Sequence, residues 1–64
     1  MNKKGIISSI NNSLVRVTFP SDNNVVSGEL PVASHVTGLT VGSQVAVMFF
    51  YPNNLNDGVI IARW

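Results

Sequence analysis

Val45-Ala46-Val47-Met48-Phe49-Phe50-Tyr51 is the stretch that decides the fold, and Val59-Ile60-Ile61-Ala62 follows it after a short interval. Both runs are apolar at consecutive positions, whereas a strand with one face in water alternates apolar and polar residues. The interval, residues 52–58, consists of Pro, Asn, Asp and Gly around a single Leu, a composition typical of turns. The sequence therefore predicts an antiparallel hairpin with two largely apolar faces.

The second apolar face of this hairpin must be buried against another layer or a partner. Successive side chains of a strand point to opposite sides, so if Val45 and Phe49 point into the core, Met48 points outward. A chain of 64 residues without a predicted helix has no layer of its own to place there, and a contiguous exposed apolar patch normally marks an interface. We therefore expect a homo-oligomer joined through this face, with these interface residues: Ala46, Met48, Phe50, Ile60 and Trp64. For Trp64, an exposed tail is an equally open interpretation, although tryptophan is enriched in interface hot spots.

Three further short strands are predicted before the hairpin, at residues 5–10, 14–19 and 25–32. The second of them alternates apolar and polar residues, which indicates one core side and one wet side. Gly28 interrupts the third and predicts a bulge or a sharp bend. Residues 33–43 are punctuated by glycines and predict a loop with at most one helical turn.

Five short strands separated by turn clusters, with no substantial helix, predict an all-β fold: a small five-stranded closed barrel forming a single domain over residues 1–64. Closure would remove the exposed strand edges that so apolar a sheet otherwise presents. The expected core consists of Ile6, Val15, Val17, Phe19, Leu30, Val45, Val47 and Phe49.

Composition excludes several classes of function. Hydrophobic residues make up 45% of the chain and charged residues 11%, with a net charge of +1, so there is no broad basic footprint for nucleic acid. The absence of cysteine excludes disulfides, zinc ribbons and Fe–S clusters, and one histidine with three carboxylates makes a metal cage or another cofactor site unexpected. The apolar runs are too short to span a membrane, and no signal peptide is evident, so we expect cytoplasmic synthesis without export.

An enzyme is not expected. His35 is the single histidine, and no carboxylate lies near it in the sequence to orient it as a general base or metal ligand. Nucleophilic catalysis by a serine would need that same histidine and an orienting group. We therefore interpret His35 as an ordinary loop residue.

The aromatic triplet Phe49-Phe50-Tyr51 raises the alternative of a binding module for single strands, because OB-folds stack bases on aromatic side chains within a basic groove. The basic groove is missing from the sequence, since the four basic residues are scattered and Lys3 and Lys4 are interpreted as a solvated N-terminal arm. Phosphate contacts dominate nucleic-acid affinity, so a core or interface role is favoured for the aromatics.

Five motifs occur in series: Gly5-Ile6-Ile7, Val15-Arg16-Val17-Thr18-Phe19-Pro20, Leu30-Pro31-Val32, Val41-Gly42-Ser43-Gln44-Val45-Ala46-Val47-Met48-Phe49 and Asn56-Asp57-Gly58-Val59-Ile60-Ile61. In this order the chain resembles the OB-fold domain of phage baseplate assembly protein V and of related spike proteins in type VI secretion and other contractile injection systems. The resemblance covers residues 5–62. It implies a trimeric hub with the barrels packed around a threefold axis and with other tail proteins as partners.

The sequence departs from that family in two places. Most such proteins continue into a β-helical needle where this chain stops, and the segment between Val32 and Val41 is short. The function predicted from the resemblance is therefore a structural hub or adaptor of a phage-like baseplate or spike, located in the virion tail after synthesis, rather than a membrane-piercing needle. The chain would be either a stand-alone minimal hub or part of a longer spike. The alternative is a small OB- or SH3-like module that binds single-stranded nucleic acid.

Overall fold

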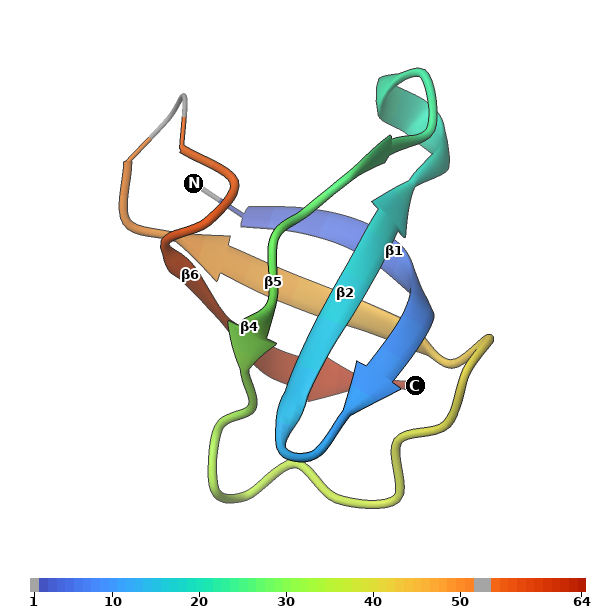
Figure 1. The fold of residues 1–64 in the computed structure, drawn as a ribbon, viewed down its shortest axis with the longest axis vertical. Coiled ribbons are helices and arrows are strands. Elements are labelled where there is room, and N and C mark those ends of the chain that lie inside the picture. The colour runs from blue at the N-terminus through green and yellow to red at the C-terminus, as the bar shows by residue number, and fades with distance from the viewer. Residues whose placement is uncertain (1, 52–53) are drawn as a thin grey trace.

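Six β-strands and one short 3-10 helix make up the chain in the computed structural model, which describes residues 2–51 and 54–64 (Figure 1). In chain order the elements are β1 (Asn2–Asn11), β2 (Leu14–Phe19), η1 (Pro20–Asp22), β3 (Val25–Val26), β4 (Leu30–Pro31), β5 (Gln44–Phe49) and β6 (Gly58–Arg63). The all-β prediction is confirmed, and residues 33–43 form a loop without a helix as expected. The predicted turn residues Pro52 and Asn53 lie outside the described part of the chain.

Two strands differ from their predicted extent. β1 begins at Asn2, so Lys3 and Lys4 belong to the sheet rather than to a free arm. The strand predicted over residues 25–32 is broken into β3 and β4. Gly28 lies in the middle of this break, where the sequence predicts a bulge or bend.

Ser27 holds the two halves of that broken strand onto β2. Its N–H donates to the Val17 carbonyl (2.8 Å), and its Oγ accepts a hydrogen bond from the Val17 N–H (3.1 Å) while donating to the Gly28 carbonyl (2.8 Å). The side chain thus takes the place of a backbone carbonyl in the ladder. Because Ser27 is buried, these bonds satisfy polar groups that water cannot reach.

The strands form one antiparallel sheet in the order β3-β2-β1-β5-β6, and β4 pairs with β2 beyond the break. At the other end of the sheet, β4 lies beside β6 (Figure 1). The described backbone joins these ends through an isolated parallel bridge between Val32 and Ile60, with the Ala33 N–H donating to the Ile60 carbonyl at 2.9 Å. In the described residues, β4 and β6 are not joined by a continuous ladder of hydrogen bonds beyond this bridge. The predicted closed barrel is therefore not confirmed. Pro31 has no N–H to donate, which limits the pairing that β4 can offer.

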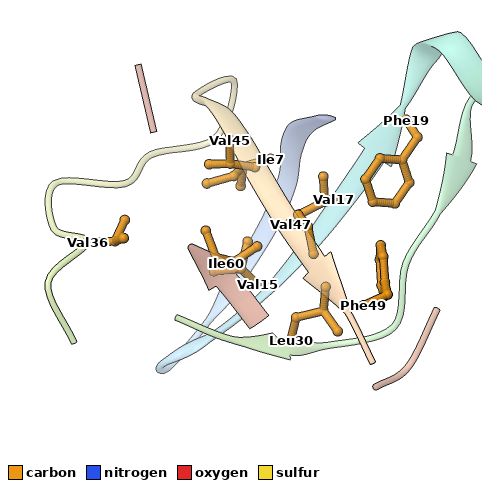
Figure 2. Packing of buried hydrophobic residues seen from close by; sticks show 10 residues of the cluster. All are labelled: Ile7, Val15, Val17, Phe19, Leu30, Val36, Val45, Val47, Phe49 and Ile60. Carbon is orange, nitrogen blue, oxygen red and sulfur yellow. The ribbon is translucent and has the colours of Figure 1, made fainter. Parts of the chain in front are cut away.

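The core lies inside this curved sheet, and its residues come from β1, β2, β4, β5, β6 and the 33–43 loop. Figure 2 shows most of these side chains gathered between the strands, with Val36 to one side on the loop. The Phe19 and Phe49 rings meet edge to face, with centroids 5.8 Å apart. Seven of the eight predicted core residues are buried: Val15, Val17, Phe19, Leu30, Val45, Val47 and Phe49. Ile7, Val36 and Ile60 complete the cluster.

Ile6 was wrongly assigned to the core, because it is 39% exposed whereas its neighbour Ile7 is 1% exposed. The register explains the difference. Ile7 lies opposite the buried Val17, whereas Ile6 lies opposite Thr18 on the other face. A bulge between Ile7 and Ser9 then changes the phase of the strand.

Gly5 is the inward-facing residue of β1 that allows β2 to approach closely. A Cβ at this position would overlap Val17 Cγ1 and would lie 2.8 Å from the Thr18 carbonyl oxygen and 2.9 Å from Phe19 Cδ1. The carbonyl belongs to the paired backbone and cannot move aside alone. The β1–β2 packing therefore requires glycine here.

We expect Gly5→Ala to lower the free energy of unfolding by about 1–3 kcal/mol, because overpacking a filled core forces side chains and backbone apart. In a domain of this size, that loss corresponds to a fall in melting temperature of roughly 4–8 °C per kcal/mol. Thermal unfolding followed by circular dichroism measures it, with Ser9→Ala on the exposed side of β1 as the matched control. Equal melting temperatures for Gly5→Ala and Ser9→Ala would contradict the close packing.

Candidate protein interface

The outward face of β5 lies where strand alternation predicts it. Val45, Val47 and Phe49 are buried at 0–1% exposure, and the residues between them point away from the core. Ala46 and Met48 are half-buried on that outward face. Two of the predicted interface residues are therefore in position, on the middle strand of the β1–β5–β6 layer.

Ile60 was wrongly assigned to the interface. It is 0% exposed and lies opposite the buried Val47, so it belongs to the core. The outward contribution of β6 comes instead from Val59, which lies opposite Met48, and from Ala62, which lies opposite Ala46. The sequence does not show which residues of the apolar run 59–62 face inward, because every residue in that run is compatible with either face.

Ile61 is the extra residue of a bulge in β6, because Ile60 pairs with Val47 and Ala62 with the preceding residue of β5, Ala46. His35 Nε2 lies 2.9 Å from the Ile61 carbonyl oxygen, and that ring nitrogen donates to it when protonated. His35 thus contacts the bulge and supports the edge of β6.

Two exposed aromatic residues follow the end of β5. Phe50 is 57% exposed and Tyr51 is 62% exposed. The Phe50 N–H donates to the Asp57 carbonyl at 3.1 Å, so the hairpin pairing extends one residue past the strand and fixes the Phe50 backbone. At the opposite end of β5, Trp64 is 58% exposed and its N–H donates to the Gln44 carbonyl at 3.2 Å.

A hollow of about 180 Å³ opens beside Trp64 on this side of the molecule. Its lining combines apolar surface with one cation and consists of Lys4, Gly5, Ile6, Pro20, Ser21, Gln44 and Trp64. Sequence reasoning missed this hollow because its residues come from four separate segments: β1, η1, the start of β5 and the residue after β6. One signal in the sequence could have indicated the hollow. Ile6 and Ile7 are adjacent apolar residues of one strand, so only one of them can point into the core and the other must form an apolar surface outside.

The basic side chains do not form a track across this surface. Lys3 pairs with Asp22 at 2.7 Å and its Nζ lies 5.6 Å from the Phe19 ring centroid. Arg16 is on β2, and the Arg63 guanidinium lies beside Gly38. Of the four basic residues, Lys4 is the one next to the outward face, since it lies opposite Ala46 in the β1–β5 pairing. The local field is therefore weak, and the chemical character of the face is apolar.

The described residues contain no group of three or more His, Asp or Glu side chains that could hold a metal ion. Within the same residues, no helix has the length and apolar character that crossing a bilayer requires. The interaction that the outward face can offer a partner is apolar packing.

Comparison with known proteins gave no relatives: no protein-family model, no curated protein and no solved structure matches the chain.

Proposed function

We propose that this protein is a structural hub or adaptor of a phage-like, contractile tail baseplate or spike, and that it works as a homo-oligomer. The observation that carries the proposal is the outward face of the hairpin, where Ala46 lies opposite Ala62, Met48 lies opposite Val59, and the exposed Phe50 follows Met48 by two residues. A patch of this kind normally marks a protein interface. Rigid assembly, rather than catalysis, is then the activity of the domain.

Assembly also accounts for the weakly charged composition. Small domains gain little stability from a single core, and partner subunits are one of the usual supplements. Burying one exposed Phe or Met side chain contributes roughly 1.5–3 kcal/mol. With 11% charged residues, the chain has few of the surface charges that keep free monomers soluble.

The baseplate assignment and the threefold symmetry rest on the resemblance of the five sequence motifs to spike-hub OB domains. Each motif includes residues of a strand: β1, β2, β4, β5 and β6 in turn. If β3 and β4 count as one broken strand, the chain has five strands in one curved sheet, and the OB-fold is itself a five-stranded, partly open barrel. This agreement supports the proposal.

We also propose that the subunit functions as a closed OB-like barrel, sealed between β4 and β6. The Val32–Ile60 bridge and the hydrogen bond from the Ala33 N–H to the Ile60 carbonyl support closure at that seam. Hydrogen exchange offers a test, since closure predicts that the Ala33 amide is protected as strongly as the amides of β5. An Ala33 amide that exchanges as fast as those of residues 37–39 in the loop would argue that the barrel is open between β4 and β6.

The baseplate role is tested by locating the protein in lysates of cells that produce the tail particles. We expect it to sediment with tail particles, and we expect particles made with Met48→Asp to lack it or to be incomplete. Tails that assemble normally and carry none of the protein would argue against a hub.

Phe50 and Tyr51, both exposed, are the observation that favours the second candidate, binding of single-stranded nucleic acid. We expect that binding to be weak or absent, because the scattered cations supply no continuous phosphate contacts. Fluorescence anisotropy with labelled single-stranded DNA and RNA at about physiological salt measures it. Saturable micromolar binding that is lost in Tyr51→Ala would move the assignment to a nucleic-acid module.

A further inference from the structure

The outward side of the molecule carries two different features at the two ends of β5. Phe50 projects beyond one end, and the hollow beside Gln44 and Trp64 opens at the other. Phe50 lies six positions after Gln44 along the strand, which places the features about 20 Å apart. A protruding ring and a hollow on one copy cannot meet each other, but they can meet those of a second copy.

The size of the hollow suits one side chain. At about 180 Å³ it is smaller than the roughly 300–1,000 Å³ typical of sites for small ligands and cofactors. Ile6, Pro20 and Trp64 supply apolar walls for a ring. Phe50 is suited to fill such a hollow, because its backbone is already fixed by the hydrogen bond to Asp57 and little freedom is lost when the ring docks.

The charges at the two ends of β5, beside the hollow and beside Phe50, are complementary. Lys4 lines the hollow, and Asp57 lies beside Phe50 across the hairpin. In the described residues, the one ion pair joins Lys3 to Asp22, so Lys4 and Asp57 both remain available for a partner. A Phe ring entering the hollow would bring Asp57 toward Lys4 and would also place the ring near the Lys4 ammonium, which aromatic faces attract.

We propose that copies of this chain join head to tail, with Phe50 of one copy seated in the hollow of the next and Asp57 facing Lys4 across the contact. The proposal rests on the homo-oligomer proposed above and specifies its contact. Repeated in one direction from copy to copy, this contact is heterologous, and heterologous contacts generate rings when the rotation closes and open filaments when it does not. The closed form of this arrangement is a ring of three or more copies, as opposed to a twofold dimer in which two copies exchange their Phe50 rings.

Two substitutions at exposed positions separate the two halves of the contact. Phe50→Ala removes the ring, and Ser21→Trp fills the hollow from η1. We expect each variant to stay folded by circular dichroism and to raise the dissociation constant in analytical ultracentrifugation by roughly 10- to 100-fold. Val41→Ala, at a 64% exposed residue of the loop that lines no part of the hollow, is the control and should assemble like the wild type.

Mixing the two variants is the decisive step. The Phe50→Ala copy keeps an open hollow and the Ser21→Trp copy keeps its ring, so an equimolar mixture should form 1:1 pairs through one intact contact and nothing larger. The single variants should remain monomeric at the same concentration. Lys4→Glu and Asp57→Lys should each weaken wild-type assembly, and the double variant should recover it.

A mixture that stays monomeric, or a Phe50→Ala or Ser21→Trp variant that assembles like the wild type, would overturn the head-to-tail contact. If Met48→Asp still dissociates the wild-type assembly in that case, the proposed homo-oligomer stands with a different contact. A wild type that is itself monomeric would overturn both proposals.

Discussion

Val17→Asp is expected to prevent folding. Val17 is 0% exposed in the middle of β2, opposite Ile7, and both of its backbone polar groups bond Ser27. A carboxylate at this position would be buried without a partner, which costs several kcal/mol even if the group takes up a proton. Native domains have only about 5–15 kcal/mol of stability, and one of 64 residues is expected near the lower end. Circular dichroism and urea unfolding should show no cooperative transition for this variant.

The matched control for that experiment is Arg16→Asp, one residue earlier on the same strand and exposed. We expect it to melt within a few degrees of the wild type, since surface substitutions usually change stability by less than about 0.5 kcal/mol. A soluble Val17→Asp variant with a cooperative transition close to that of Arg16→Asp would contradict the assigned core.

Met48→Asp is expected to dissociate the assembly while leaving the subunit folded. Met48 is half-buried on the outward face of β5, between Asn2 on β1 and Val59 on β6. A charge there remains hydrated in the monomer but loses its water in the oligomer, so the penalty falls on association. We expect Phe50→Asp to behave in the same way. Size-exclusion chromatography with light scattering measures the change.

Thr18→Asp is the control for the oligomer experiment, because Thr18 lies on β2 outside the β5–β6 surface. Both the wild type and Thr18→Asp should elute as the assembly, and Met48→Asp as a folded monomer. If Met48→Asp assembles as tightly as Thr18→Asp, the outward face of the hairpin is not the interface.

The sequence was informative wherever apolar and polar residues alternate. Val15, Val17 and Phe19 are buried as predicted, because Arg16 and Thr18 leave only one possible inward set. The same reasoning failed where two apolar residues adjoin. Nothing local distinguishes Ile6 from Ile7, and the choice is made by the register with β2 and by Gly5, whose missing side chain admits Val17 and Phe19.

Ile60 was misassigned for a related reason. In an unbroken apolar run the phase of the strand is set by its partner, here Val47, and the bulge at Ile61 shifts the residues that follow. The contacts that complete the fold are also non-local. Ser27 bonds Val17 from ten residues away, and His35 reaches Ile61 from 26 residues away. Neither contact leaves a pattern in the sequence, since each depends on how the sheet curves.

The candidate interface could be predicted only in part, on the same physical grounds. Strand alternation indicated Ala46 and Met48, and the exposure of Phe50 and Trp64 agrees with their predicted surface position. The hollow depends on β1, η1, the start of β5 and Trp64 meeting in space, and no local pattern carries that information.

Sedimentation equilibrium of the wild-type protein at micromolar concentration tests the central claim, that copies of this domain assemble through the outward face of the final hairpin. The account predicts a folded oligomer, with three chains of 6.9 kDa giving about 21 kDa. A dimer would contradict the proposed threefold symmetry and the proposed head-to-tail ring. A folded monomer of 6.9 kDa over the whole concentration range would contradict the claim itself.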